Sequence, residues 1–251
     1  MRRLLAATAL TLATGLPVLA DGLTNMTDAE REVFRAEVRA FLLDNPEVLI
    51  EVMNELESRD QAAAAERDKQ MLAQNGDVIF NDPASWVGGN PEGDITVVEF
   101  LDYRCGYCRK AWQEVDQLVE GDGNIRFVVK EFPILGEQSV LSSRFAIAVL
   151  QLHGGEAYKK AHDALLSLRA DTTPEALERV ATDLGLDPAP IMDRMNAPEV
   201  TKVIEDNHKL AQMMEVSGTP TFVVGGTMVR GYVPLEAMQQ IVDEQRKAQE
   251  G

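Results

Sequence analysis

The segment Leu101-Asp102-Tyr103-Arg104-Cys105-Gly106-Tyr107-Cys108-Arg109-Lys110 contains both cysteines of this 251-residue chain. It follows an apolar run, Ile95-Thr96-Val97-Val98-Glu99-Phe100-Leu101, which predicts a buried strand. The residues after the first cysteine predict a helix. Free backbone N–H groups at a helix N-terminus favour a thiolate over a thiol. The spacing therefore predicts a nucleophile, Cys105, and a resolving thiol, Cys108, within bonding reach of each other.

Three other uses of this cysteine pair compete with disulfide exchange. A zinc site needs about four ligands, and the only histidines, His153, His162 and His208, are scattered singly along the chain. A structural disulfide across so short a loop removes little entropy from the unfolded chain. Two buried, inert thiols remain an alternative, although an exported chain would tend to oxidise them.

The N-terminus predicts export. A basic start, Met1-Arg2-Arg3, precedes a short apolar core at residues 4–16 and the small-residue site Val18-Leu19-Ala20. This order is typical of a signal peptide over residues 1–20, with an uncleaved anchor as the alternative. We therefore expect a periplasmic, oxidising location. The net charge of −17 argues against nucleic acid or an anionic membrane as a partner.

Residues 21–76 predict an N-terminal helical stalk and linker. Thr27-Asp28-Ala29-Glu30 is a capping box, and an apolar stripe follows it: Phe34, Val38, Phe41 and Leu42. Asn45-Pro46 interrupts the helix, residues 57–74 are polar, and Asn75-Gly76 is the expected stop. Such short stripes cannot bury themselves. They pack either on the main domain or on copies of the chain, and the polar segment favours a homo-oligomer through residues 27–75.

Residues 77–251 alternate between strand and helix patterns. We expect strands at 78–80, 95–101 and 125–132, a loop over 82–94, a hairpin within 221–230 and a last helix from about Pro234. Between them, residues 137–216 have a helical pattern with glycine and proline interruptions. The predicted fold class is α/β, with an all-helical insertion into a strand–helix core.

The motifs of residues 77–251 resemble the DsbA family of thioredoxin-fold oxidoreductases. The matching segments are residues 98–108, Val129-Lys130-Glu131-Phe132-Pro133 and Gly218-Thr219-Pro220-Thr221-Phe222. The family carries a helical insertion in its thioredoxin core. The preceding helices, with Phe41-Leu42-Leu43-Asp44-Asn45-Pro46-Glu47, resemble the oligomerising stalk of ScsC-like and Com1-like members.

This resemblance implies roles for the site residues. Cys105 would be the attacking thiolate and Cys108 the resolving thiol. Pro220 would be a cis proline facing the pair, and the backbone of Thr219 would pair with the bound peptide. Taken alone, Thr219-Pro220 is also compatible with an ordinary turn into a strand.

Glu99 stands in the middle of an apolar strand, so we expect it to be buried and its pKa to be raised. The resemblance makes it the acid beneath the cysteines that exchanges protons with Cys108, with Lys130 as its partner. The alternative is that both side chains face solvent by strand alternation. Arg104 and Arg109 either favour the thiolate or only make the surface around the cysteines more soluble.

The dipeptide between the cysteines refines the function. Gly106-Tyr107 and Thr219 look like the isomerase DsbC at these positions, whereas the insertion looks like DsbA. We expect a disulfide oxidoreductase of exported cysteine-containing proteins, leaning to isomerase, with no cofactor and a DsbB-like or DsbD/ScsB-like membrane redox partner. The alternatives are a dithiol oxidase re-oxidised by a membrane partner, and a copper chaperone using Met192, Met195, Met213 and Met214, which are otherwise core residues.

Overall fold

The computed structural model describes residues 25–250, so the predicted signal peptide lies outside the described residues. The chain divides into two compact units, with the division between Asp60 and Gln61. Each unit is described separately below. Among the helices that the structure describes, none has the length and apolar character needed to cross a membrane.

The first unit contains α1 (Asp28–Asp44) and the beginning of α2 (Glu47–Phe80). The predicted capping box is present: the Thr27 hydroxyl accepts from the Glu30 N–H, and the Glu30 carboxylate accepts from the Thr27 N–H at 2.8 Å. No residue of α1 is buried, and Phe34 and Phe41 are 46% and 54% exposed. The apolar stripe of α1 therefore has no cover within the described chain.

The structure corrects the predicted end of the stalk. The expected strand at 78–80 is wrong, because these residues form the last turn of α2, which continues through Asn75-Gly76. Leu72 and Ile79 lie seven residues apart on one helix face, and both are buried against the sheet. Burial of this face continues the helix past its expected stop, so the last turns of α2 belong to the second unit.

The second unit is built around a five-stranded mixed sheet. Its strands are β1 (Trp86–Gly89), β2 (Ile95–Leu101), β3 (Ile125–Glu131), β4 (Thr221–Val224) and β5 (Thr227–Arg230), in the order β1-β3-β2-β4-β5. Only the central pair, β2 and β3, is parallel. The segment predicted as a loop, 82–94, contains the edge strand β1. The predicted central strands and the hairpin are confirmed.

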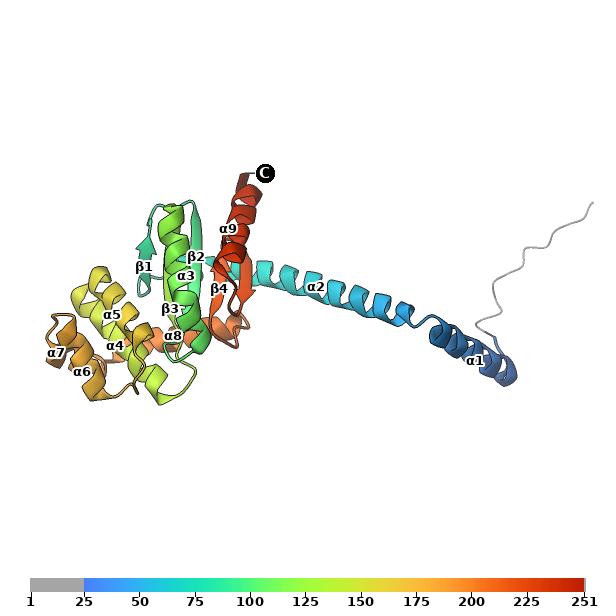
Figure 1. The fold of residues 1–251 in the computed structure, drawn as a ribbon, viewed down its shortest axis with the longest axis horizontal. Coiled ribbons are helices and arrows are strands. Elements are labelled where there is room, and N and C mark those ends of the chain that lie inside the picture. The colour runs from blue at the N-terminus through green and yellow to red at the C-terminus, as the bar shows by residue number, and fades with distance from the viewer. Residues whose placement is uncertain (1–24, 251) are drawn as a thin grey trace, which may run out of the picture. The chain divides into compact units, whose positions relative to one another are not determined.

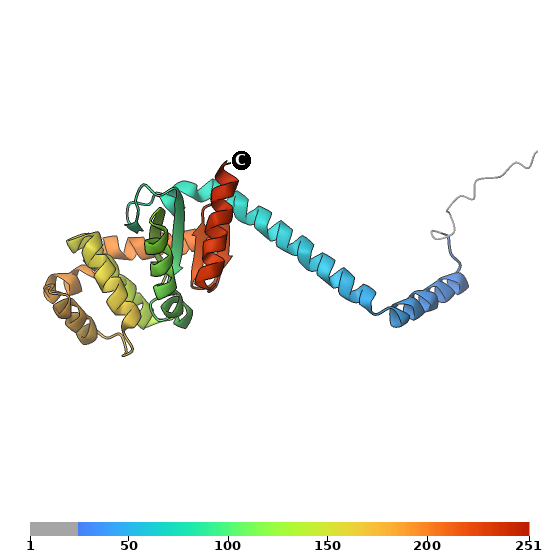
Figure 2. The same ribbon diagram turned by 45° about the horizontal axis from the view of Figure 1, so that its top comes forward.

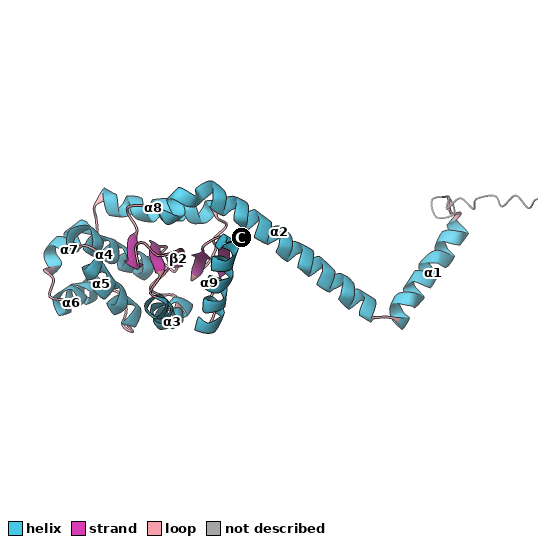
Figure 3. Ribbon diagram, turned by 90° about the horizontal axis from the view of Figure 1, so that it is seen from above, coloured by secondary structure: helices cyan, strands magenta, loops and turns pink. Residues whose placement is uncertain are grey.

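Helices cover both faces of this sheet (Figure 3). One face carries Val97, Leu101 and Phe127, which pack with residues of α3 (Gly106–Asp122) and α9 (Leu235–Glu250). The other face carries Val98, Phe100 and Val128, which pack with α8 (Pro198–Met213) and the end of α2. Alternation of side chains along each strand produces these two separate cores.

The predicted helical insertion is confirmed. It comprises α4 (Glu137–His153), α5 (Gly155–Ser167), α6 (Pro174–Asp183), α7 (Pro188–Arg194) and α8. In Figures 1 and 2 the yellow-green to orange helices α4–α7 form a group beside the sheet. Prolines at the first turns of α6, α7 and α8 mark their starts, as a missing backbone N–H costs nothing there.

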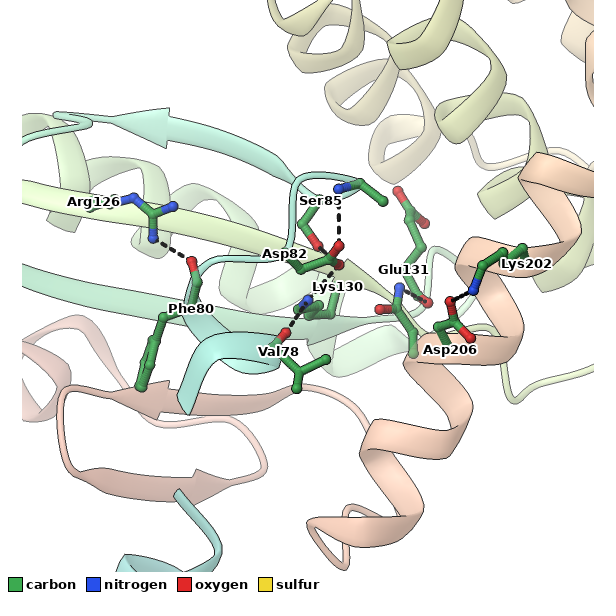
Figure 4. A network of polar contacts seen from close by, with 11 residues as sticks. Val78, Phe80, Asp82, Ser85, Arg126, Lys130, Glu131, Lys202 and Asp206 are labelled. Atoms are coloured by element: carbon green, nitrogen blue, oxygen red, sulfur yellow. Dashed lines mark hydrogen bonds and ion pairs between the residues drawn. The ribbon is translucent and has the colours of Figure 1, made fainter. Parts of the chain in front are cut away.

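Cationic side chains fasten the end of α2 to the sheet (Figure 4). Lys130 donates to the Val78 carbonyl at 2.8 Å and to the Asp82 carboxylate at 2.7 Å, while Arg126 donates to the Phe80 carbonyl at 2.8 Å. The carbonyls at a helix C-terminus attract positive charge, so these contacts stabilise the helix end as well as its docking. Farther along the same helix, Asp68 accepts two hydrogen bonds from Arg230.

Candidate active site

The sulfur of Cys105 lies where the sheet meets α3. Cys105 is the N-cap residue of that helix, in an extended conformation, and Cys108 lies in the first turn. Both cysteines are free thiols. The Cys105 thiol donates to the Thr219 carbonyl at 3.1 Å, and the Thr219–Pro220 peptide bond is cis. The structure therefore brings together four of the residues that the sequence predicts for the site.

Hydrogen bonds favour the ionised form of Cys105. They lower the pKa of this thiol to about 5, chiefly through a hydrogen bond with the Cys108 side chain and also through the backbone N–H groups of Cys108 and Tyr107. Burial acts in the opposite direction but is outweighed. Cys105 is thus prepared to act as a nucleophile near neutral pH.

Cys108 has the opposite character. Its side chain has no exposed surface, and burial raises its pKa far above that of a free thiol. The hydrogen bond with Cys105 and the nearby carboxyl of Glu99 raise this pKa further. Cys108 is held as a thiol, so it requires a proton acceptor before it can react.

Glu99 supplies a buried carboxyl close to both sulfurs. It is 2% exposed, and its Oε1 atom has no hydrogen-bond partner among the described residues. Burial, followed by the charges of Asp116, Cys105 and Glu131, raises the pKa of Glu99 to about 8. A carboxyl with this pKa can take up or release a proton near neutral pH.

The prediction that Lys130 partners Glu99 is wrong. Glu99 stands opposite Val129 in the parallel pair of β2 and β3, so the next residue, Lys130, points to the other face of the sheet. Lys130 is fully buried there and bonds with Asp82 and Val78 (Figure 4). Its position makes it an anchor of α2 and not a member of the cysteine site.

The charged side chain of β3 that does share the face of Glu99 is Glu131, a site residue that the sequence did not predict. Its Oε1 atom accepts from the Tyr103 hydroxyl at 2.8 Å and from the Tyr158 hydroxyl at 2.6 Å. Burial raises the pKa of Glu131 to about 7. His162 lies 3.2 Å from the Tyr103 hydroxyl, and burial lowers its pKa to about 3. Lys130 and Glu131 are adjacent in the strand and must point to opposite faces, and this was the signal that could have revealed Glu131.

Asp102 fixes the loop before the cysteines. It is fully buried, and its carboxylate accepts from the backbone N–H groups of Arg104 at 2.7 Å, Ile134 at 2.8 Å and Leu135 at 3.0 Å. A carboxylate that accepts hydrogen bonds from several backbone N–H groups holds the segments that carry those groups together. Asp102 therefore joins the cysteine loop to the segment that follows β3.

The dipeptide between the cysteines is exposed. Gly106 has open space where a Cβ would stand, and Tyr107 is 63% exposed. The Tyr107 ring stacks on the Tyr232 ring, with 6.4 Å between centroids and 22° between planes. The Lys110 ammonium lies 4.0 Å from the centre of the Tyr232 ring. These side chains form an aromatic edge beside Cys105.

A metal site is a further possibility to compare with the geometry of residues 25–249. That part of the chain contains no group of three or more His, Cys, Asp or Glu side chains placed to hold a metal. The methionines predicted as alternative copper ligands do not form one cluster. Met195 belongs to the core on the α3 side of the sheet, and Met214 belongs to the core on the α8 side.

The thiolate of Cys105 gives a direct prediction. Titration of the reduced protein, followed by thiolate absorbance near 240 nm, should show a midpoint near pH 5. The Cys108→Ala variant should show a higher midpoint, because the largest stabilising hydrogen bond is gone. Between pH 5 and 9 the folded reduced chain binds fewer protons than the unfolded chain, so this ionisation adds stability as the pH rises. A wild-type midpoint above pH 8 would contradict the geometry of the site.

Two family models match the chain. One, described as a DSBA-like thioredoxin domain, matches residues 96–243, and one described as the copper resistance protein ScsC N-terminal domain matches residues 30–63. The Na(+)/H(+) antiporter NhaA 1 of Salinispora arenicola (strain CNS-205) is 30% identical over 161 residues, or 62% of this chain. The chain spans about a quarter of that relative's length, 24%.

Solved structures show the same relationship. A thioredoxin-like oxidoreductase from Silicibacter pomeroyi DSS-3 is 44% identical, with a TM-score of 0.65 over 68% of this chain and 97% of that one. BcfH of Salmonella enterica Typhimurium is 26% identical, with a TM-score of 0.73 over 86% of this chain and 96% of that one. With the first family model covering more than half of its length, the chain belongs to the DSBA-like thioredoxin domain family.

Proposed function

We propose that this protein is a thiol–disulfide oxidoreductase that acts on exported cysteine-containing proteins. The observation that carries the proposal is the pairing of Cys105, which caps a helix N-terminus and ionises easily, with the fully buried, protonated Cys108 in the first turn of the same helix. The two thiols differ in acidity in the sense that directional disulfide exchange requires. Membership in the DSBA-like family supports the same chemistry.

The reaction begins when the Cys105 thiolate attacks a client disulfide. One client sulfur becomes bonded to Cys105, and the other leaves as a thiolate. In isomerisation that client thiolate, or another one, later attacks the mixed disulfide and restores the free Cys105 thiolate. In reduction Cys108 loses its proton to Glu99, attacks Cys105 and releases the client sulfur, leaving a Cys105–Cys108 disulfide.

Isomerisation is the direction that we favour. Gly106-Tyr107 and Thr219 resemble the corresponding residues of an isomerase, and the match of residues 30–63 to the ScsC N-terminal domain supports a stalk. Several thiolates on one oligomer would hold a misfolded client while its bonds rearrange, because linked sites raise the effective concentration. The periplasm is the compartment in which we place this activity, with a membrane redox partner of the DsbD/ScsB-like class keeping the pair reduced.

A dithiol oxidase is the second candidate, favoured by the low pKa of Cys105. A stabilised thiolate stabilises the reduced enzyme, which makes its disulfide a stronger oxidant. Such an oxidase would need a DsbB-like partner to restore the disulfide. A copper chaperone has weaker support, because Met195 and Met214 are buried in two separate cores and Met213 is exposed.

Refolding of a scrambled multi-disulfide protein tests the main proposal. The wild-type protein, supplied reduced, should restore the activity of the client, and Cys105→Ala should not, because it lacks the attacking sulfur. Equal recovery with the two proteins would exclude the enzymatic function. A matched assay with a reduced client and oxidised enzyme measures the oxidase direction, and the redox state of Cys105 in cells distinguishes the two candidates.

The role of Glu99 gives a second prediction. In Glu99→Gln, release of a mixed disulfide by Cys108 should slow by about 100-fold, because the acceptor for the Cys108 proton is absent. In wild type this rate should rise with pH through about 8, the pKa of Glu99, and the variant should lose that step. Rapid quenching of the mixed disulfide measures both. Lys130→Met is the control. If it loses the same pH step, Lys130 acts with Glu99 despite lying on the other face.

Oligomerisation through residues 27–75 gives a third prediction. Phe34→Asp together with Phe41→Asp should reduce the mass measured by light scattering to that of one chain, because charges would enter the apolar stripe. Ala36→Asp is the control, since residue 36 lies about 200° around the helix from residue 34. An unchanged mass in the double variant would refute the stalk interface.

A further inference from the structure

Positive charge is concentrated around Cys105 on a chain whose net charge is −17. Arg104 and Arg109 flank the cysteine motif, and Arg169 lies in the loop between α5 and α6 of the helical insertion. In the part of the chain that the structure describes, Arg109 and Arg169 have no ion-pair partner. Uncompensated arginines on an acidic protein are an unusual feature to find beside a thiolate, and the proposed reaction does not itself require all of them.

Hydrogen bonds to backbone carbonyls hold two of these arginines, Arg104 and Arg109, in place. The Arg109 Nε atom donates to the Tyr103 carbonyl at 2.8 Å, and the Arg104 Nη1 atom donates to the Ala170 carbonyl at 3.0 Å. The second contact fastens the residue next to Arg169 against the cysteine loop. Burial and the charges of Arg104 and Arg169 lower the pKa of Arg109, which agrees with three guanidinium groups close together. We call Arg104, Arg109 and Arg169 the arginine rim.

The carboxylates of this region have other partners. Asp102 is fully buried and accepts three backbone N–H groups, and Glu114 accepts from the Tyr232 hydroxyl and the Leu235 N–H. Asp171 is an exposed carboxylate that pairs with Arg104 at 3.8 Å, and among the residues that the structure describes no carboxylate forms an ion pair with Arg109 or Arg169. The rim therefore keeps a net positive charge next to the reacting sulfur.

We propose that the arginine rim selects client segments that carry acidic residues beside the reacting cysteine. The proposal rests on the proposed function and names its substrate class. The rim provides guanidinium groups for the client's carboxylates, while the aromatic edge of Tyr107 and Tyr232 lies on the site's surface for apolar client residues. In the step concerned, the Cys105 sulfur bonds to the client sulfur and the second sulfur of the client disulfide leaves as a thiolate.

Two peptides test this preference with the reduced, full-length mature protein. Each carries one cysteine as a mixed disulfide with a chromogenic aromatic thiol. In one peptide the cysteine is flanked by Asp on both sides, and in the other by Asn. The release rate of the aromatic thiolate is measured with the protein and with a small neutral thiol, which corrects for intrinsic reactivity. The corrected Asp/Asn ratio should be about three to ten at low ionic strength and should approach one in about 0.5 M salt.

Variants of the rim identify the groups responsible. Arg109→Gln and Arg169→Gln should each lower the corrected ratio, and the double variant should bring it close to one. A change in the nucleophilicity of Cys105 affects both peptides alike and cancels in the ratio. Lys209→Gln is the control for net charge, because Lys209 is exposed on α8, which packs on the other face of the sheet. It should leave the ratio unchanged.

The outcomes separate the two proposals. A corrected ratio of one or less in wild type, or a raised ratio that the double rim variant retains, would refute the role of the rim while both peptides still react rapidly. If neither peptide reacts faster with the protein than with the small thiol, the proposed function itself fails. A raised ratio that salt and the double variant both abolish supports selection of acidic clients by the arginine rim.

Discussion

The alternation of side chains along β2 and β3 is the constraint on which the rest of the structure depends. It sends Glu99 and Glu131 to one face, toward α3 and the cysteines, and sends Lys130 to the other face, toward α2. The two parallel strands thus place a carboxyl that can exchange protons on one face of the sheet and the lysine that binds the end of α2 on the other face. A shift of register by one residue would exchange these groups and destroy both functions.

The two cysteines differ in pKa because they differ in burial and in hydrogen bonding, although they belong to one motif. Both sulfurs belong to the same short motif, yet Cys105 receives hydrogen bonds at a helix N-terminus and Cys108 is enclosed by the core. Burial penalises the charged form of a thiol, and directed N–H groups favour it. Within one helical turn, hydrogen bonding outweighs burial at Cys105, which becomes the nucleophile, and burial dominates at Cys108, which remains the resolving thiol.

The sequence predicts the parts of this molecule that long or repeated patterns specify. The strand before the cysteines and the helical insertion were predictable because each extends over many residues with a consistent pattern. The hairpin and the capping box of α1 were predictable because particular residue types at fixed spacing mark them. The run at 78–80 was too short to distinguish a strand from a helix end, and contact of Ile79 with the sheet decided between them. Strand β1 was not predicted, because its two glycines are typical of a loop. A Cβ on Gly88 would lie 2.1 Å from the Trp86 ring, so this glycine serves side-chain packing within a strand and does not mark a turn.

The site was predictable in its motif residues and less so in its partners. Glu99, the cysteines and Thr219-Pro220 come together as expected, but the pairing of Glu99 with Lys130 required knowledge of which face each strand residue occupies. Glu131 and its tyrosines come from three separate segments, and their contacts depend on the packing of the insertion, which no local pattern reveals.

The contact between Cys105 and the Thr219 carbonyl has a consequence for the order of events at the site. Only the protonated sulfur can donate to that oxygen, at 3.1 Å in this structure. When the sulfur ionises, the carbonyl loses its donor and becomes an open acceptor beside the cis peptide bond. The protonated Cys105 therefore occupies the backbone acceptor that a bound peptide would use. Ionisation makes the sulfur nucleophilic and at the same time frees the Thr219 carbonyl to accept a hydrogen bond from the peptide.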